Sequence, residues 1–298
     1  MLVLDDASVA RLLDMRDLIP AIERALHDLS AGRVVQPVRA VVPVVGHGGF
    51  LGSMPAYAGG HLGAKLVTFY PNNHGLPTHH ALVLLFRAET GEPLVVMDGR
   101  LITEMRTAAA SAVATARLAR TDAAVLAIIG SGVQARSHLE ALRLIRHFRE
   151  VRVWSPRGAA AFARAHAVSP AASAELAVRG ADVVVVATTS RTPVVTGEWL
   201  PPGSHVNAVG ATRPDWRELD DEVMKRASLF VDSREAALLE SGDVRAAGRM
   251  PVEIGEVIAG TRPGRQANDE ITLFKSVGVA VEDVASAALV YERASAGG

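Results

Sequence analysis

The 298-residue sequence contains no cysteine, which excludes disulfides, thiolate zinc sites and a cysteine nucleophile. It has no excess of charge, because 31 Lys and Arg stand against 32 Asp and Glu, a formal net charge of -1. We therefore expect neither nucleic acid nor a membrane surface as a partner. Its apolar runs are too short to span a bilayer, and the first residues lack a signal-peptide pattern. These features favour a cytoplasmic protein.

The sequence does contain enough apolar residues for a sizeable core, at 49% of the chain. Its length suits about two domains. In the first part, residues 1–30 predict helices and residues 34–56 predict extended chain. Two strand-like runs joined by Glu89–Glu92 predict a hairpin, and residues 103–120 predict a long helix rich in alanine.

The pattern changes after Thr121 to short apolar strands alternating with helices. Strands buried on both faces of a parallel sheet have this apolar pattern without polar alternation. The acidic residues 220–222 follow a loop and favour the start of a helix, where negative charge is stabilised. We expect a doubly wound domain over residues 119–270. Its strand-like runs are AVLAIIG, EVRVWS, ADVVVVATT, SHVNAVG and SLFVDS.

The stretch LAIIGSGVQARSHLEAL predicts a dinucleotide-binding turn. A strand precedes it, a helix follows, and a second strand comes next, as this motif requires. Gly130 permits a tight turn, Gly132 lets a pyrophosphate approach, and Ala135 lets helix and strand pack. The backbone N–H groups at the helix start would then face the phosphates. The alternative is a glycine turn without a ligand.

The second strand of this domain bears on the choice of dinucleotide. NAD-selective sites place an acidic residue near its end to bind the ribose hydroxyl. Here the strand ends in Val-Trp-Ser-Pro-Arg, with Ser155 and Arg157 in that region. A hydroxyl and a guanidinium suit a 2′-phosphate. This predicts NADPH, with NADH as an alternative, unless Arg157 is an ordinary solvated arginine.

Three cations in the first part, Arg39, Lys65 and Arg106, lie in stretches of apolar or small residues. A buried cation is costly unless it is paired, so such residues indicate a site for a substrate carboxylate. Each taken alone is explained equally well by a structural ion pair. The histidines of residues 74–80 have no carboxylate cluster nearby, so we expect no metal. Thr78 and His79 instead suggest a loop that touches substrate.

Taken together, these segments resemble the ornithine cyclodeaminase/mu-crystallin family, and most closely its mu-crystallin branch of NADPH-dependent ketimine reductases. The similarity extends over most of the chain in one order. The matching stretches are QPVRAVVP, LGSMPAY, AKLVTFYP, VVMDGRLITEMRTAA, IIGSGVQARSH, HVNAVGATRPDWRELDDEVM, VDSREAALLESGDV and LFKSVGVAVEDVAS.

The resemblance implies an α/β fold with a Rossmann-type doubly wound domain at 119–270. It also implies a second α/β domain for substrate binding and dimerisation, at 1–118 and completed by 271–298. A homodimer agrees with the apolar strands of the first part, which need a partner. The family positions imply that the substrate is contacted by Arg39, Lys65, Thr78, His79 and Arg106. They imply that the pyrophosphate is contacted by Gly130, Gly132, Val133 and Gln134, and the 2′-phosphate by Ser155 and Arg157. The residues implied near the nicotinamide are Thr188, Val209, Lys275 and Ser276.

One departure from the cyclodeaminase branch affects the reaction. Thr212 stands where that branch has a catalytic aspartate. We therefore expect reduction of cyclic ketimine carboxylates, of the piperideine- or pyrroline-2-carboxylate type, with Lys65, Arg106 and Thr212 at the reacting centre. The alternatives are an ornithine cyclodeaminase or an alanine-dehydrogenase-like amino-acid oxidoreductase, and a mu-crystallin-like protein that binds a hormone or an aromatic acid.

Overall fold

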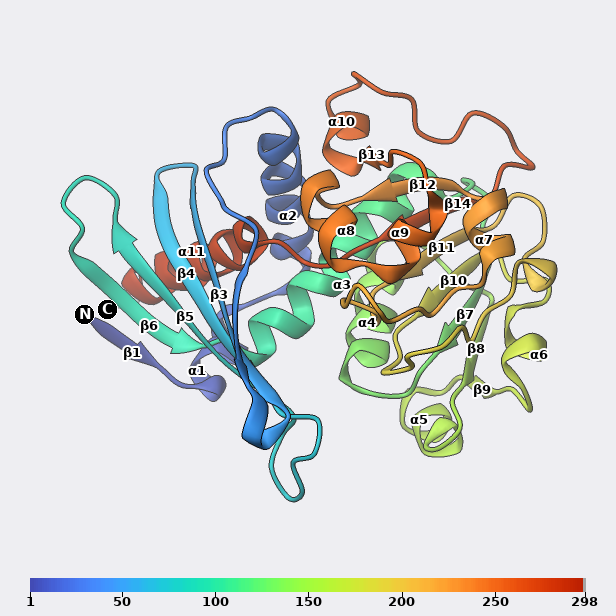
Figure 1. Ribbon diagram of the computed structural model, residues 1–298, viewed down its shortest axis with the longest axis horizontal. Helices are drawn as coiled ribbons and strands as arrows, with labels where there is room; N and C mark the ends of the chain where they lie inside the picture. The colour runs from blue at the N-terminus through green and yellow to red at the C-terminus, as the bar shows by residue number, and fades with distance from the viewer. Residues whose placement is uncertain (297–298) are drawn as a thin grey trace. The chain divides into compact units, whose positions relative to one another are not determined.

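A computed structural model describes residues 1–296 of the chain, which form two compact units (Figure 1). The first unit contains Met1–Arg106 and the chain from Gly278 onward, and the second contains Thr107–Val277. Residues 297 and 298, the last two of the expected segment 271–298, lie outside the described residues.

The first unit is built on a sheet that has, within residues 1–296, six strands in the order β1-β6-β5-β4-β3-β2. Neighbouring strands are antiparallel, except that β1 runs parallel to β6. The predicted hairpin is confirmed, since residues 89–92 join β5 to β6. The strands are β1 (Leu2–Leu4), β2 (Ala40–Val44), β3 (Gly49–Ala58), β4 (His61–Phe69), β5 (His79–Arg87) and β6 (Pro93–Asp98).

Helices cover one face of this sheet. Helix α11 (Ala280–Ala296) packs on β3, β4 and β5 and against α2 (Met15–Ser30), while α1 (Asp6–Leu12) contacts β6 and α11. The helical prediction for residues 1–30 was right for α1 and α2. It was wrong for Leu2–Leu4, because that apolar run pairs with β6 as an edge strand.

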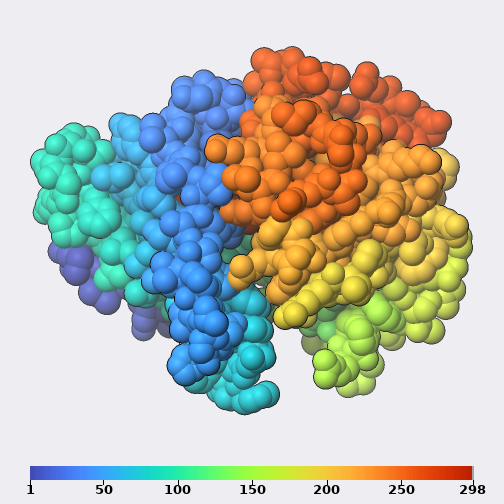
Figure 2. Space-filling view, viewed as in Figure 1, coloured from blue at the N-terminus to red at the C-terminus, as the bar shows by residue number. Residues whose placement is uncertain are grey.

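The opposite face of the same sheet carries exposed apolar side chains. On β4 the inward residues include Lys65 and Val67, while Leu66 between them points outward and is 36% exposed. Its cross-strand neighbour Leu82 on β5 is 49% exposed. Figure 2 shows the turn η1 (Val45–His47) and the β4–β5 connection, residues 70–78, together at one end of the first unit.

The second unit contains a parallel sheet, which among the described residues has eight strands in the order β13-β12-β14-β11-β10-β7-β8-β9. The expected doubly wound arrangement is therefore observed. The strands are β7 (Val125–Ile129), β8 (Glu150–Trp154), β9 (Ser169–Pro170), β10 (Val183–Val186), β11 (His205–Ala208), β12 (Ser228–Val231), β13 (Val252–Glu253) and β14 (Thr272–Lys275).

Short helices connect these strands. Asp220 caps α7 by accepting a hydrogen bond from the Val223 N–H, so the predicted helix start after the acidic run is confirmed. The helices are α4 (Val133–Ile145), α5 (Ala159–His166), α6 (Ala174–Val178), η2 (Gly197–Trp199), α7 (Asp221–Arg226), α8 (Arg234–Glu240), α9 (Gly242–Ala247) and α10 (Ile254–Ile258).

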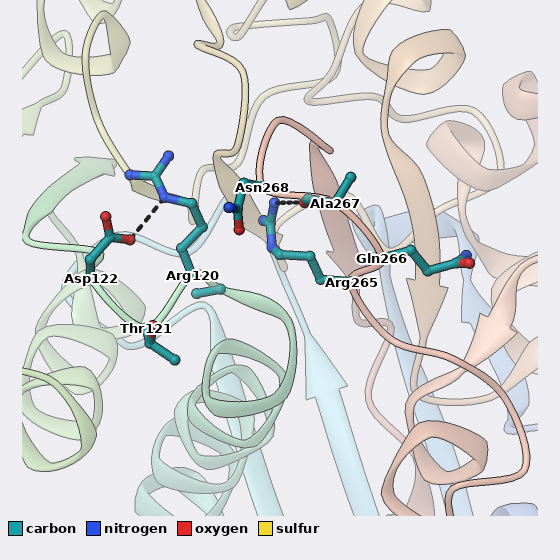
Figure 3. A pocket seen from close by; sticks show the side chains of 8 residues that line it. Arg120, Thr121, Asp122, Arg265, Gln266, Ala267 and Asn268 are labelled. Atoms are coloured by element: carbon teal, nitrogen blue, oxygen red, sulfur yellow. Dashed lines mark hydrogen bonds and ion pairs between the residues drawn. The ribbon is translucent and has the colours of Figure 1, made fainter.

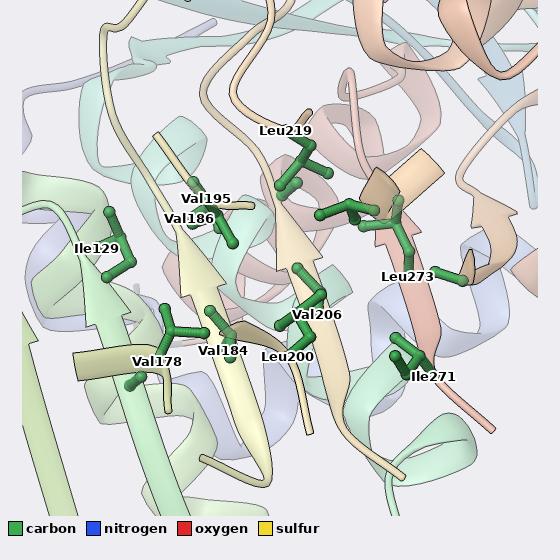
Figure 4. Packing of buried hydrophobic residues seen from close by; sticks show 14 of the residues in the cluster. Ile129, Val178, Val184, Val186, Val195, Leu200, Val206, Leu219, Ile271 and Leu273 are labelled. Carbon is green, nitrogen blue, oxygen red and sulfur yellow. The ribbon is translucent and has the colours of Figure 1, made fainter. Parts of the chain in front are cut away.

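The core of the second unit is made of side chains from neighbouring parallel strands (Figure 4). Ile129, Val184 and Val206 come from three adjacent strands and are inaccessible to solvent. Every residue of β7 and β10 is buried, which explains why these strands lack polar alternation.

The units do not begin and end where the sequence predicted. Helix α3 (Arg100–Leu118) crosses the boundary at Arg106, twelve residues before the expected end at 118. Strand β14, which we had placed with the first domain, pairs instead with β11 and β12. The reason is that Thr272–Lys275 completes the parallel sheet, and the first unit resumes only at Gly278.

Candidate active site

The glycine turn lies at the carboxyl end of β7. Gly130 has a φ of 125°, a conformation that favours glycine, and a side chain there would collide with the Ala187 carbonyl oxygen. Gly132 precedes α4 without a side-chain cap, and among residues 1–296 no atom beyond its two chain neighbours lies within 4 Å of where its Cβ would be. Exposed Val133 begins the helix, followed by Gln134. An open, uncapped helix start of this kind fits a pyrophosphate.

The loop after β8 is held against the glycine turn by a serine hydroxyl from each of the two segments. Ser131 Oγ lies 2.8 Å from Ser155 Oγ and donates to the Arg157 carbonyl at 3.0 Å. Ser155 Oγ also donates to that carbonyl. The Arg157 side chain is exposed, and the loop residues 155–158 include no acid.

Glu218 binds the carboxyl ends of two neighbouring strands together. Its Oε1 accepts from the Thr188 N–H and hydroxyl at 2.8 and 2.7 Å. Its Oε2 accepts from the N–H groups of Gly210 and Ala211 at 2.7 and 3.0 Å. Burial raises the pKa of Glu218, against the opposing effects of Lys275 and the bonds from Thr188. These bonds fix the chain immediately before Thr212, which is half-buried.

Lys275, at the end of β14, is fully buried beside two carboxylates. Its Nζ lies 3.8 Å from Glu218 Oε2 and 3.5 Å from Asp243 Oδ2. The next residue, Ser276, donates its hydroxyl to Asp232 at 2.9 Å. Thus one ammonium, that of Lys275, lies near two buried carboxylates behind the strand ends and can offset one of their charges. Val209 is also buried there, and its N–H donates to the Val186 carbonyl at 3.0 Å.

The first unit contains a charged cluster made of Arg39, Lys65, Arg106, Glu282 and Asp283. Lys65 Nζ donates to Asp283 Oδ1 at 2.9 Å. Arg106 donates from Nε to Asp283 at 3.2 Å and from Nη1 to Glu282 at 2.6 Å. Except for half-buried Arg39, all these side chains are buried.

Gly278 supports the arginines of this cluster. Its carbonyl accepts from Arg39 Nη2 at 2.8 Å, and a side chain at this position would collide with the Arg106 guanidinium. Three cations and two carboxylates leave these five side chains with one positive charge when all are ionised. An anionic substrate with a single carboxylate matches that charge.

Burial lowers the pKa of Lys65 from 10.5 to about 8, although the Asp283 charge opposes this shift. The nearby charges of Arg106 and Arg39 lower the pKa further. At neutral pH Lys65 is therefore largely an ammonium, but one that can lose its proton readily. This suits a group that delivers a proton to a substrate.

Thr78 and His79 do not both lie in a loop, as we had expected. Thr78 ends the β4–β5 connection, but His79 is the first residue of β5. The His79 ring packs against Phe69, with ring centroids 4.5 Å apart. The pKa of His79 is lowered first by desolvation and then by the charge of Lys65.

Four acids that hold the predicted residues in place were not predicted from the sequence: Glu282, Asp283, Glu218 and Asp243. The stretch GVAVEDVAS places two adjacent acids in an apolar segment, which is the same signal that singled out the three cations.

Within residues 1–296, His, Asp and Glu side chains form no group of three or more suited to a metal ion. None of the described helices is long and apolar enough to cross a membrane.

A pocket of about 810 Å³, whose lining side chains Figure 3 shows, lies before the amino ends of β7 and β14, whereas the glycine turn follows the carboxyl end of β7. Its lining includes Arg120 and Arg265. Arg120 pairs with Asp122 and Asp182, at 3.0 and 2.6 Å, and Arg265 donates mainly to backbone carbonyls. We assign this pocket no part in the site.

The parallel sheet with its glycine turn, joined to a unit with a buried cationic cluster, defines a Rossmann-type protein of the dehydrogenase class. More narrowly, residues 1–298 match the Ornithine cyclodeaminase/mu-crystallin family, and the chain belongs to that family.

Relatives within this family include a ketimine reductase mu-crystallin from Rattus norvegicus. It is 50% identical over 292 residues, which cover 94% of this chain and 93% of the relative. The Delta(1)-pyrroline-2-carboxylate reductase of Thermococcus litoralis, solved with NADH and L-proline, is 40% identical. Its TM-score is 0.95, with 100% of this chain and 98% of that chain covered. An archaeal alanine dehydrogenase dimer with bound NAD is 39% identical, with a TM-score of 0.94 and coverage of 100% and 97%.

Proposed function

We propose that this protein reduces cyclic ketimine carboxylates, of the piperideine- or pyrroline-2-carboxylate type, to cyclic amino acids. The observation that carries the proposal is the pair of Lys65 and Arg106 held by one buried carboxylate, Asp283. This arrangement combines a carboxylate-binding guanidinium with an ammonium of lowered pKa. The named relatives include reductases of such imines.

Arg106, with Arg39, binds the substrate carboxylate, and the surplus positive charge of the cluster favours one carboxylate per substrate. Lys65 donates a proton to the imine nitrogen, which makes the imine carbon electrophilic. Thr78 and His79 complete the substrate contacts, and Thr212 orients the ring by a hydrogen bond.

The second unit holds a dinucleotide, which supplies the hydride when it is bound. Gly130, Gly132, Val133 and Gln134 bind the pyrophosphate at the start of α4. Ser155 and Arg157 bind the 2′-phosphate, so NADPH is preferred over the NADH seen with one relative. The strand ends contact the nicotinamide half at Thr188, Val209, Lys275 and Ser276. Lys275 contributes there through its backbone, because its side chain lies behind the strand ends beside Glu218 and Asp243.

The protein acts as a homodimer in this proposal. Leu66, Leu82 and Tyr57 give the outer face of the first sheet an exposed apolar surface, with Tyr57 46% exposed. Surfaces of this kind are usually covered by a partner. The archaeal alanine dehydrogenase, which shares the fold, is a dimer.

Assays of the purified protein test the function. Oxidation of NADPH that depends on a cyclic ketimine carboxylate, with the cyclic amino acid as product, is the expected result. Release of ammonia from ornithine would instead identify a cyclodeaminase, and reductive amination of pyruvate an alanine dehydrogenase. Tight binding of an aromatic acid without turnover of any of these substrates would identify a binding protein.

A further inference from the structure

We propose that Asp283 is a positioning residue that fixes Lys65 and Arg106 relative to each other and keeps Lys65 in its ammonium form. The inference rests on the proposed reduction, in which Lys65 delivers a proton. Asp283 is assigned no contact with the substrate. It acts through the two side chains that it holds.

The geometry around Asp283 carries this inference. Its carboxylate lies against Lys65 Nζ with both oxygens, at 2.9 Å from Oδ1 and 2.8 Å from Oδ2. The same Oδ1 accepts from Arg106 Nε at 3.2 Å. Asp283 is fully buried, so water does not compete for these contacts. One carboxylate thereby sets the spacing of an ammonium from a strand and a guanidinium from a helix.

The surroundings of Lys65 explain why the carboxylate is needed. The cross-strand neighbours of Lys65 are Met54 on β3 and Val83 on β5, both buried and apolar. A buried ammonium between such residues is unfavourable unless an anion compensates it. The titratable and charged groups near Lys65 are Asp283 and Glu282 from α11, Arg106 from α3, Arg39 from the segment before β2, and His79 from β5.

Two of these groups disfavour a charge on Lys65. Arg106 and Arg39 repel it, and Asp283 is the anion in direct contact with it. Asp283 itself lies in the first turn of α11, where the helix dipole stabilises a negative charge. Removing that charge alone leaves Lys65 buried beside two guanidinium groups, a setting that favours the neutral amine.

The experiment uses the small number of lysines in the chain, namely Lys65, Lys225 and Lys275. Protein labelled with ¹³C at the lysine ε-carbon gives one signal for each, and Lys65→Arg identifies that of Lys65. We expect the wild-type Lys65 signal to titrate near pH 8. In Asp283→Asn the midpoint should lie lower by about one pH unit or more, because the amide keeps the shape but not the charge.

Two further variants distinguish the effect of the direct Asp283–Lys65 contact from that of the negative charge in the first turn of α11. Glu282→Gln removes a neighbouring carboxylate of the same helix turn and should move the Lys65 titration less. Asp283→Glu retains the charge and should restore most of the wild-type value. The inference would be overturned by a Lys65 pKa unchanged in Asp283→Asn, or shifted equally by Glu282→Gln. If Asp283→Asn does not fold, Glu282→Gln decides: a Lys65 midpoint that stays near the wild-type value supports the inference, and a midpoint lower by about one pH unit or more overturns it.

Kinetics supply a second measurement. In wild type, kcat/KM for the ketimine should fall above about pH 8, as Lys65 loses its proton. In Asp283→Asn this fall should begin at a pH lower by about one or more, so that kcat/KM in alkaline solution is roughly tenfold below the wild-type value at the same pH. If the wild-type protein does not reduce ketimines at all, the proposed function fails, while the lysine titrations still decide the role of Asp283.

Discussion

Thr188 donates both its backbone N–H and its hydroxyl to a single oxygen of Glu218, at 2.8 and 2.7 Å. The other oxygen of Glu218 holds the next strand end through Gly210 and Ala211. All four bonds need an acceptor, and a glutamine can supply only one carbonyl oxygen. In Glu218→Gln the side-chain NH₂ group therefore faces the N–H or hydroxyl donors on one side, and those donors lose their acceptor.

We expect Glu218→Gln to lower the free energy of unfolding by about 1–3 kcal/mol, the usual cost of unsatisfied buried polar groups. It should also weaken NADPH binding, because the strand ends assigned to the nicotinamide half lose their anchor. Urea unfolding and fluorescence titration measure the two effects. Thr188→Val, which removes only the hydroxyl, should lower the free energy of unfolding less. An equal loss in both variants would contradict the role of Glu218 in holding the two strand ends.

Arg157→Ala should raise the KM for NADPH roughly tenfold or more, since a charge-assisted contact contributes about 1.5–3 kcal/mol. The KM for NADH should hardly change, because NADH has no 2′-phosphate. Steady-state kinetics with each cofactor test this. Arg164→Ala, on α5, serves as the control for loss of a basic side chain. Equal weakening of both cofactors, or of neither, would show that Arg157 does not discriminate between them.

Thr212→Val should retain substantial ketimine reduction, whereas Arg106→Ala should nearly abolish it. A threonine hydroxyl does not ionise near neutral pH, so it contributes at most a hydrogen bond. Arg106 provides the positioning on which the reaction depends. Rates of NADPH oxidation with a cyclic ketimine distinguish the two variants. Strong formation of ammonia and proline from ornithine by the unmodified protein would contradict this division of roles.

Protonation of two buried histidines should destabilise the protein in acid. Burial lowers the pKa of His138 to about 4 and that of His205 to about 3. His138 donates from Nδ1 to the Gln134 carbonyl, so its Nε2 accepts from Ser111. The neutral His138 ring thus fits both of its partners without an extra proton.

In the unfolded chain a histidine binds its proton near pH 6.5. Because both folded values are depressed, the stabilisation is fully present above pH 6.5 and is lost as the pH falls toward 4 and 3. We expect a loss on the order of 3 kcal/mol per histidine over that range. Unfolding measured from pH 7 to 4 checks this, and His138→Gln should have a shallower dependence on pH than the wild type.

Leu82→Arg should convert the expected dimer into a monomer at micromolar concentration, since it places a charge in the exposed apolar face of the first sheet. Sedimentation velocity measures the change. Leu239→Arg, at a similarly exposed apolar position on α8, is the matched control and should leave the dimer intact. A wild-type protein that sediments as a monomer would refute the dimer itself.

Local pattern in the sequence determined much of this protein. The turn at Gly130, the helix cap at Asp220 and the hairpin after β5 depend on residues near one another in the chain, so they were predictable. The continuous apolar composition of β7 and β10 likewise indicated a parallel sheet. The resemblance to a family extended the prediction to the cations of the first part.

Only the tertiary structure decided which acids form ion pairs with those cations. Lys65 and Asp283 are 218 residues apart and meet because α11 packs on the sheet that contains β4. Glu218 lies just before residues 220–222, which we assigned to a helix start, and that assignment is right for Asp220. Glu218, to which we assigned no role from the sequence, is buried and bonds to the strand ends instead. Strand β14 was misassigned for the same reason. Pairings between distant segments follow from how sheets and helices pack, and the local sequence does not encode that packing.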